Sequence, residues 1–593
     1  MGDDITKLKK EIERLKKAVK KQKYGLVWMD VPEAFEDDVE NKLPILKEVP
    51  GLAIKNEDGK PTHILIEGDN YHALTCLNYT HKGKIDVIYI DPPYNTGSDG
   101  FKYKDKRILD KFPDGTEVPK DHPFRHSYWL SFMNKRLELA KTLLKNDGII
   151  LISIDDNETA QLKLLCDEIF GEENRLSTHH VQVRYADKTL NEKNDWQPVM
   201  EYVFIYAKKS NSFKANKPSV EYSLDKFVYE IKELTQGAKI SVKNRNVKIF
   251  KKGEWQIIKH KVPADNLLKE IWVSGSIYSG TGNGAMVRNI IEPRMEVDGY
   301  GSLYKIEGLG EDGLGYRYFV GPQKIGANRS KMYMGVPTVK LEEINNGNGA
   351  MKFKSIPNIY DFSPDFGNIR HEGGIGFNSG KKPVKMLKQL ISYHQNKNVI
   401  VLDFFAGSGS TAQAVLELNE EDGGKRQIIV NTDNESKIMT DFCYPRIKNV
   451  IKGYNNTKAL GNSIKYYKTE FIGKNNILDA TDEDKIELAH NAGELLAVAE
   501  NTLELVKQNK YYQLFEDGNK KRNTAVYFRE EQDEFNNFIE MVKKLNKETT
   551  VYVFSWGDEE KIDDFAGIKE IKVKTIPLPI LEIYKQIYNL STQ

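Results

Sequence analysis

The chain has 593 residues, too many for one hydrophobic core, and its length predicts about three to four domains. Its 87 basic and 86 acidic residues nearly cancel, which excludes a uniformly basic surface and requires any nucleic-acid-binding surface to be a local patch. The three cysteines lie far apart without zinc-binding spacing, no apolar run approaches about 18 residues, and no signal peptide is recognisable. We therefore expect a soluble, cytoplasmic protein with reduced thiols.

The first 22 residues carry apolar side chains at alternating spacings of three and four. They are Ile5, Leu8, Ile12, Leu15 and Val19. This pattern predicts an amphipathic helix, shorter than the roughly three heptads of a stable coiled coil. The helix could contact a second subunit or lie on its own domain, and both interpretations stay open.

A strand, a turn and a helix are expected between residues 61 and 80. His63–Ile66 predicts the strand, Gly68 and Asp69 the turn, and the apolar spacing from Tyr71 onward the helix. Asp69 directly precedes this helix and suits its N-cap position, where a carboxylate accepts a backbone N–H.

Residues 85–97 form the most informative stretch, Ile-Asp-Val-Ile-Tyr-Ile-Asp-Pro-Pro-Tyr-Asn-Thr-Gly. An apolar, β-branched run that stops at two prolines predicts a buried parallel strand followed by a rigid loop, and ligands of open α/β sheets bind at such strand ends. Asp91 and the Pro92 carbonyl could accept the two hydrogens of an amine, Pro93 stiffens the loop, and Tyr94 could stack on a flat heterocycle. The pattern indicates a site for a planar exocyclic amine; the alternative is a turn with a core tyrosine.

Residues 98–124 are polar and rich in Gly, Lys and Pro, which predicts a long loop beside this site, as in an active-site lid. Aromatic and basic residues interleave in it, as suits a loop that grips an unstacked base. They are Phe101, Lys102, Tyr103, Lys104 and Arg107. An ordinary solvated loop is the alternative.

Strands and helices then alternate as in a mostly parallel sheet. We expect a helix at 125–145, a strand at 149–154, a helix opened by Asp155 and Asp156, and a strand at 199–206. The acidic run Asp155-Asp156-Asn157-Glu158 could suggest a metal site, but we interpret it as capping the dipole of the second helix and expect no metal.

The alternation disappears between residues 211 and 364, where glycines and basic residues concentrate. The basic residues are Lys239, Lys243, Arg245, Lys248, Lys251, Lys252, Lys259 and Lys261, and the arginines that could read bases are Arg288, Arg294, Arg317 and Arg329. Such a segment could contact phosphates and base edges of DNA. A basic, β-rich insertion without a nucleic-acid role is the alternative.

A second glycine-rich region begins at His371–Gly380 and continues through Lys381, Lys382 and Pro383 into a helix. Pro383 suits the first turn of that helix, whose N-terminus would favour a ligand carboxylate. Residues 399–411 then run from a strand through a glycine turn into a helix near Ser410, and Asp403 at the strand end suits a positively charged ligand.

The remaining chain predicts one more strand of this sheet and a small α/β region. The strand Gln427–Val430 ends near Asp433 and Glu435, and we choose Glu435 as the carboxylate that would bind ribose hydroxyls. Beyond residue 470 we expect a helix from Thr481 to about Val506, strands at 525–528 and 551–554, and a helix at 533–545 between them. No phosphate-binding, nuclease or helicase motif is present in the sequence.

Asp91-Pro92-Pro93-Tyr94 and Asp403-x-Phe405-x-Gly407-x-Gly409 together resemble the catalytic loop and the S-adenosyl-L-methionine loop of the DNA amino-methyltransferases. The order, catalytic loop first, resembles the β class. Residues 23–30, 66–74 and 126–170 resemble the modification (Mod) subunit of type III restriction–modification systems. The resemblance covers roughly residues 1–210 and 365–593.

The resemblance implies an α/β fold: a Rossmann-like, mostly parallel methyltransferase sheet with an inserted target-recognition domain and a small C-terminal α/β domain. The expected divisions are 1–22, an N-terminal helix; 23–210, the first half of the methyltransferase; 211–364, the target-recognition domain; 365–470, the second half; and 471–593, a C-terminal domain with a possible subunit contact.

The resemblance also assigns residues. The catalytic candidates are Asp91, Pro92, Pro93 and Tyr94. The cofactor candidates are Asp69, Lys382, Pro383, Asp403, Phe404, Ala406, Gly407, Ser408, Gly409, Thr411 and Glu435. The DNA candidates are Lys102, Tyr103, Lys104, Arg107, Lys243, Arg245, Lys248, Lys251, Lys252, Arg288 and Arg317.

The function implied is site-specific transfer of a methyl group from S-adenosyl-L-methionine to the N6 amine of an adenine flipped out of double-stranded DNA, without a metal. The implied partners are a second copy of the chain and a restriction subunit on another chain. An N4-cytosine enzyme, an RNA adenine enzyme and a non-catalytic DNA-recognition subunit stay open as alternatives.

Overall fold

The computed structural model describes residue 28 and residues 42–581, apart from 97–115, 118–122, 190–191, 194, 275–281, 328, 348, 377–379, 435, 474–481, 529–531, 555–562, 566, 569 and 578–579. By its internal contacts the chain divides into two compact units. One unit comprises Met1–Asn216 and Pro357–Gln593, and the other comprises Lys217–Ile356.

The first unit is built on a ten-stranded sheet with the order β1-β20-β2-β19-β18-β3-β4-β6-β5-β17. Its strands are β1 (Lys42–Glu48), β2 (Thr62–Glu67), β3 (Ile85–Ile90), β4 (Leu144–Ile154), β5 (Arg175–Gln182), β6 (Met200–Ala207), β17 (Ile359–Asp361), β18 (Ile400–Asp403), β19 (Gln427–Thr432) and β20 (Ser463–Gly473). Neighbouring strands from β20 to β4 run parallel, whereas β1, and β6 against both of its neighbours, run antiparallel. The predicted mostly parallel α/β sheet is confirmed.

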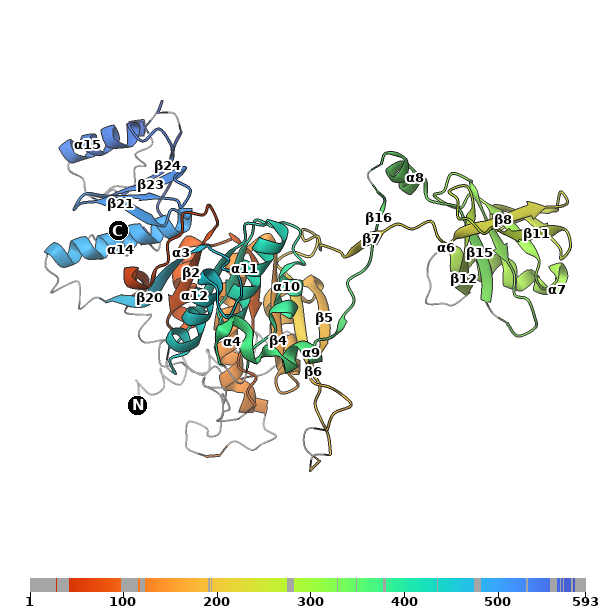
Figure 1. The fold of residues 1–593 in the computed structure, drawn as a ribbon, viewed down its shortest axis with the longest axis horizontal. Helices are drawn as coiled ribbons and strands as arrows, with labels where there is room; N and C mark the ends of the chain where they lie inside the picture. The colour runs from red at the N-terminus through yellow and green to blue at the C-terminus, as the bar shows by residue number, and fades with distance from the viewer. Residues whose placement is uncertain are drawn as a thin grey trace, which may run out of the picture. The chain divides into compact units, whose positions relative to one another are not determined.

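Two groups of helices pack on the sheet. The helices α3 (Asn70–Thr80), α4 (Ser127–Leu143) and α5 (Thr159–Phe170) contact one another in order, as do α10 (Val384–Ile391), α11 (Ser410–Asp422) and α12 (Tyr444–Lys452), which lie in front of the sheet in Figure 1. All six residues of β3 are buried, because a central parallel strand is covered on both faces. Burial of these apolar side chains stabilises the layers by roughly 1.5–3 kcal/mol per large side chain.

The position of β18 determines where the site forms. It lies between β19 and β3 and pairs in parallel with both, with Val401 opposite Val87 and Leu402 opposite Ile88. Strands that are far apart in the sequence therefore end side by side. Because parallel strands share one carboxyl edge, the loops after β3 and β18 leave the sheet together.

The C-terminal part of this unit carries a second sheet with the order β21-β22-β23-β24-β25. Its strands are β21 (Glu504–Gln508), β22 (Tyr512–Glu516), β23 (Arg522–Tyr527), β24 (Glu548–Val553) and β25 (Ile571–Val573), with α14 (Asp482–Glu500) and α15 (Gln532–Lys543). The helix predicted to reach Val506 ends at Glu500, because the residues after Leu503 form the edge strand β21. Along the described residues, no helix is both long and apolar enough to cross a membrane.

The second unit is an antiparallel sheet with the order β11-β8-β12-β15-β14-β13-β10-β9. Its strands are β8 (Phe227–Glu233), β9 (Ala238–Val242), β10 (Arg245–Phe250), β11 (Trp255–Lys259), β12 (Leu268–Ser274), β13 (Leu303–Glu307), β14 (Tyr316–Val320) and β15 (Arg329–Met334). Val287, Ile290 and Ile291 of a helical segment pack on one face of this sheet. The chain enters and leaves through a paired ribbon, in which β7 (Ser219–Glu221) bonds β16 (Met351–Phe353) (Figure 1).

The predicted role of the acidic run before α5 is also wrong. The acidic run at residues 155–158 does not cap α5, which begins at Thr159 with no acidic residue in its first turn and no side-chain cap. Asp155 accepts hydrogen bonds from Asn157 and Asp156 accepts one from Tyr202. Glu158 is fully buried and faces the loop after β3 instead.

Candidate active site

Hydrogen bonds with α4 and with the residue that precedes α5 hold the loop after β3 in place. Trp129 donates its indole N–H to the Pro93 carbonyl over 2.7 Å. Asn95, in the left-handed region with a φ of 60°, donates to Glu158 Oε1 over 2.6 Å, and His126 Nδ1 lies 2.7 Å from the same oxygen. Buried partners of this kind fix the backbone, so the loop has one preformed shape.

Two side chains of this loop and two from elsewhere form a charged cluster, which we call the Asp91 cluster: Asp91, Tyr94, Glu201 and Lys382. The Tyr94 hydroxyl lies 2.8 Å from Asp91 Oδ1 and 3.1 Å from Glu201 Oε2. Lys382 Nζ lies 3.0 Å and 3.2 Å from the same two oxygens. The cluster is largely closed, since the exposed fractions of the Asp91, Glu201 and Lys382 side chains are 19%, 19% and 7%.

Burial and mutual charge control ionisation in this cluster. Burial raises the pKa of Asp91, the Lys382 ammonium opposes that rise, and the Glu201 carboxylate adds to it. Burial raises the pKa of Tyr94 well above its usual value, and both carboxylates raise it further. The tyrosine therefore stays a neutral hydrogen-bond donor. Lys382 also lies 4.9 Å from the centre of the Tyr94 ring.

The loop after β18 is organised around the Asp403 side chain. Its two carboxylate oxygens accept the Phe405 N–H over 2.9 Å and the Thr411 hydroxyl over 2.6 Å. Burial raises the pKa of Asp403 to about 7, although both hydrogen bonds oppose that rise. Asp403 thus acts within the loop, and its own oxygens are already partnered.

Most residues of this glycine loop are buried. Phe404, Ala406, Ser408, Gly409 and Thr411 are buried, whereas Phe405 and Gly407 are partly exposed. Gly407 and Gly409 adopt positive φ angles of 49° and 79°. A Cβ at Gly409 would lie 3.2 Å from Cys443 Sγ, so only glycine fits this turn without strain.

Arg446 of α12 locks the glycine loop to its surroundings. The guanidinium is fully buried and donates to Ser410 over 2.7 Å, to Ser408 over 3.2 Å and to Gln413 over 2.8 Å. It also pairs with Glu372 over 3.2 Å. A buried arginine needs such a set of partners, because an unpaired buried charge is strongly unfavourable.

A second buried arginine ties the turn after β2 to the same edge. Arg136 of α4 bonds Asn70 Oδ1 and lies 3.4 Å from Asp69 Oδ2. Asn70 in turn donates to the Phe404 carbonyl over 3.1 Å, and the Asn431 carbonyl accepts the Ala406 N–H. The turn after β2, the glycine loop and the end of β19 are thereby hydrogen-bonded into one platform beside the Asp91 cluster.

The sequence pattern of the DNA methylase family matches residues 85–442, a span that contains both loops and covers more than half of the chain. The chain belongs to the DNA methylase family.

Curated relatives of this DNA methylase include Mod subunits of type III restriction–modification enzymes. The StyLTI Mod subunit of Salmonella typhimurium is 34% identical over 64% of this chain and 54% of that protein. The probable HindVI Mod subunit of Haemophilus influenzae is 29% identical over 69% and 53%, and the EcoPI Mod subunit of Escherichia phage P1 is 28% identical over 72% and 66%. The chain thus spans from about half to two thirds of these relatives' length. The predicted resemblance to Mod subunits is confirmed.

Three cofactor candidates of the DNA methylase outside the glycine loop lie at or beside helix N-termini. Asp69 caps α3 by accepting the Tyr71 N–H over 2.7 Å, which confirms the N-cap position predicted for it. Lys382 faces Asp91, as described above. Pro383 is the N-cap of α10 rather than part of its first turn, and the Val384 N–H behind it points at the Glu372 carboxylate at 3.3–3.4 Å. The helix N-terminus that was expected to bind a ligand carboxylate therefore already binds the Glu372 carboxylate of the chain itself. Glu435 lies outside the described residues.

The DNA candidates fall into two sets. Lys102, Tyr103, Lys104 and Arg107 lie outside the described residues, as does most of the predicted lid. Those in the second unit are Lys243, Arg245, Lys248, Lys251, Lys252, Arg288 and Arg317. Lys243 lies in the β9–β10 turn with a φ of 47°, and Arg245 donates to the Gly308 carbonyl. Arg317 contacts the sulfur atoms of Met332 and Met334. Their role in DNA binding stays a prediction.

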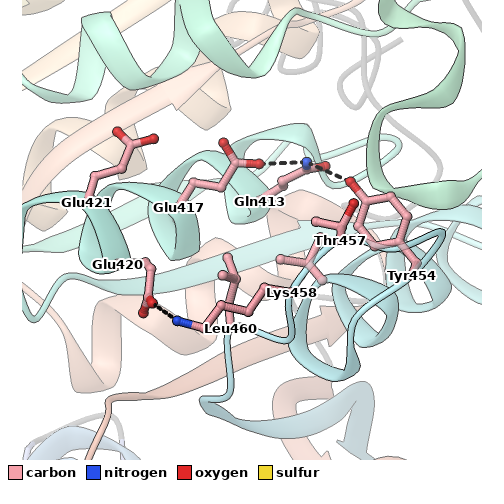
Figure 2. Close-up of a pocket in the computed structure, with 9 residues that line it drawn as sticks. Gln413, Glu417, Glu420, Glu421, Tyr454, Thr457, Lys458 and Leu460 are labelled. Atoms are coloured by element: carbon pink, nitrogen blue, oxygen red, sulfur yellow. Dashed lines mark hydrogen bonds and ion pairs between the residues drawn. The ribbon is translucent and has the colours of Figure 1, made fainter.

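Sequence reasoning missed the residues that hold the site together. They are Asn70, Arg136, Glu158, Glu201, Glu372 and Arg446. A buried charge gives no local pattern, so only the Asp69-Asn70 turn offered a signal. A surface pocket of about 190 Å³ adjoins one of them. Its wall includes Gln413, which bonds Glu417 (Figure 2). Gln413 also accepts a hydrogen bond from Arg446. None of the predicted site residues lines this pocket.

Proposed function

We propose that this DNA methylase transfers a methyl group from S-adenosyl-L-methionine to the N6 amine of an adenine flipped out of duplex DNA. The observation that carries the proposal is the meeting of two loops at one sheet edge: Asp91 and Tyr94 follow β3, and the glycine loop follows the hydrogen-bonded neighbour β18. Relatives named as type III Mod subunits support DNA modification as the activity.

The residues around the glycine loop fit a cationic nucleoside cofactor. Gly407 is partly exposed and has no side chain, which allows a ligand to approach the backbone closely, and Asp69 adds a partly exposed carboxylate. Asn431 Oδ1 is a buried acceptor with no partner among the described residues. When bound here, S-adenosyl-L-methionine would supply a sulfonium methyl group, which leaves the sulfur as a neutral thioether.

The catalytic loop would prepare the adenine amine for attack. Asp91 and the Pro92 carbonyl accept its two hydrogens, which frees the nitrogen lone pair from ring conjugation and directs it at the methyl carbon. The N–C bond would form as the C–S bond breaks, and the nitrogen would then lose one hydrogen as a proton, which the Asp91 carboxylate would accept. Positioning and exclusion of water supply most of the acceleration.

Tyr94 would receive the flipped base. Flipping costs a few kcal/mol of unstacking, and stacking on an aromatic ring recovers roughly 1–3 kcal/mol of it. Because its hydroxyl is bonded to the two carboxylates, the ring is held in one orientation and needs no ordering when the base arrives.

For the assembly, we propose a homodimer that works with a restriction subunit, which would be a separate polypeptide chain. The relatives are named as the Mod subunits of restriction–modification enzymes, which supports the second half of this proposal. The mass of the purified chain in solution tests the first half, and a single-subunit mass would contradict it.

The function is tested by transfer of label from S-adenosyl-L-methionine to random-sequence DNA, followed by digestion and identification of the modified nucleoside. We expect N6-methyladenine, and no transfer by Asp91→Ala although that variant still binds the cofactor. N4-methylcytosine would reassign the target base, and label found only in RNA would reassign the polymer. If the wild-type chain neither transferred the methyl group nor bound the cofactor, the result would refute the proposed methyltransferase activity and favour a non-catalytic DNA-recognition subunit.

A further inference from the structure

We propose that Glu201 is a positioning residue for methyl transfer: it shares the Tyr94 hydroxyl and the Lys382 ammonium with Asp91 Oδ1, so that the other carboxylate oxygen of Asp91 is left to accept the adenine amine. The inference rests on the proposed function and adds to it a residue from β6, a strand that carries no motif.

The placement of Glu201 follows from the sheet. β6 runs antiparallel to β4, with Phe204 opposite Ile152 and Tyr202 opposite Ile154, so its first residues lie at the edge where β4 ends. β4 is the parallel neighbour of β3, and the same edge therefore carries the catalytic loop. From there the Glu201 side chain reaches Tyr94 and Lys382 over 3.1 Å and 3.2 Å.

Asp91 presents two different oxygens. Its Oδ1 faces two donors, the Tyr94 hydroxyl at 2.8 Å and the Lys382 ammonium at 3.0 Å, and one oxygen has two lone pairs. An incoming N–H therefore bonds Oδ2, and the two donors on Oδ1 keep the carboxylate turned that way. A buried ammonium without an anionic partner would be strongly unfavourable, so Lys382 needs carboxylates close by.

Glu201 holds both donors in place from their other side. Its Oε2 lies 3.1 Å from the Tyr94 hydroxyl and 3.2 Å from the Lys382 ammonium, so the two donors stay at Asp91 Oδ1. The chain thus holds a second carboxylate whose position matches the two donors and which the chemistry of the amine does not use.

Charge supports the same role. The Glu201 carboxylate raises the pKa of Asp91 while Lys382 lowers it, so the two neighbours oppose each other. Two further ionisable groups feel the charges of this region. Asp91, Asp403 and Glu201 add to the raised pKa of Tyr89, and Glu201 adds to the raised pKa of Asp155. Replacing Glu201 by a neutral residue leaves Lys382 with Asp91 alone and tightens that pair.

The test compares Glu201→Gln with Asp156→Asn. Asp156 accepts a hydrogen bond from the hydroxyl of Tyr202, the next residue of β6, over 2.8 Å, so the control neutralises the carboxylate of a similar tyrosine–carboxylate pair outside the Asp91 cluster. Two measurements are made: single-turnover methyl transfer to DNA against pH, and the pH dependence of Lys382 acetylation in the free protein, read by peptide mass spectrometry.

For Glu201→Gln we expect transfer at saturating DNA and cofactor to fall about tenfold or more, with cofactor affinity within about twofold of wild type. The acidic limb of the rate profile should move to lower pH, because Asp91 loses a like charge. Lys382 should be acetylated at lower pH than in the wild type, because it loses one of two anionic partners. Asp156→Asn should change none of these quantities.

The two measurements separate the inference from the function. Unchanged Lys382 acetylation in Glu201→Gln overturns the shared-cation geometry, whether or not the chain methylates DNA. If Glu201→Gln transfers the methyl group at the wild-type rate and with the wild-type pH profile, the positioning role is overturned. A wild-type chain that transfers no methyl group refutes the proposed function and, with it, this role, even if the acetylation shift is seen.

Discussion

Replacing Arg446 by Met should weaken both the fold and cofactor binding. The guanidinium is fully buried, donates to Ser408, Ser410 and Gln413, and pairs with Glu372. Breaking a buried pair costs roughly 3–5 kcal/mol, but Glu372 is 26% exposed and keeps the Val384 N–H as a partner, so we expect the lower end, about 3 kcal/mol. Methionine fills much of the volume, so little cavity is added.

The assay is urea unfolding together with equilibrium binding of S-adenosyl-L-methionine. Because Arg446 supports the two serines that flank Gly409, we expect the dissociation constant to rise about tenfold or more, equivalent to about 1.4 kcal/mol. Lys458→Met is the control, since it removes an exposed cation that pairs with Glu420 at the surface, and it should leave both measurements unchanged. An Arg446→Met protein that binds the cofactor as tightly as the wild type would refute the reasoning.

Three further predictions concern the loops. Gly409→Ala should cost about 1–2 kcal/mol and weaken cofactor binding more than Gly423→Ala, which has a similar φ of 68° but no atom within 4 Å of the added Cβ; equal effects on binding would contradict this. Asp403→Asn should gain stability relative to wild type as the pH rises from about 4 to about 7, because the raised pKa of Asp403 makes its ionisation unfavourable across that window; a pH-independent difference in urea unfolding would argue against it. The hydrogen bond to Glu158 raises the pKa of His126, so the stability lost in His126→Ala should be largest below the ordinary histidine pKa of 6.5 and should fade as the pH rises through the raised value, as paired unfolding curves would reveal.

The two loops could be predicted because their chemistry is written in short contiguous runs. Asp91 to Tyr94 and Asp403 to Gly409 each follow an apolar strand, and both strands are found at β3 and β18. Their adjacency is a property of the sheet order, which no local pattern contains.

The supporting charges could not be predicted for the same physical reason. Glu201 contacts Tyr94 only because β6 returns antiparallel beside β4, and a lone glutamate at a strand start resembles any surface residue. Glu158 was misread because a run of carboxylates before a helix is common at N-termini, whereas tertiary burial against Asn95 decides its role here. Local periodicity likewise extended α14 past Glu500, where the chain turns into an edge strand.

The ribbon of β7 and β16 has a consequence for how specificity could evolve. Glu221 pairs with Met351 and Ser219 with Phe353, so the entire insert is joined to the chain through two strands that are already bonded to each other. The pairing of β7 with β16 brings the two ends of the insert together, so this pairing, and not the large sheet, offsets the loop-closure entropy. A different insert grafted onto the same stem would leave β3 and β18 undisturbed. If the insert reads DNA, as predicted from its basic residues, exchange of this module would change the target sequence and leave the two loops of the site intact.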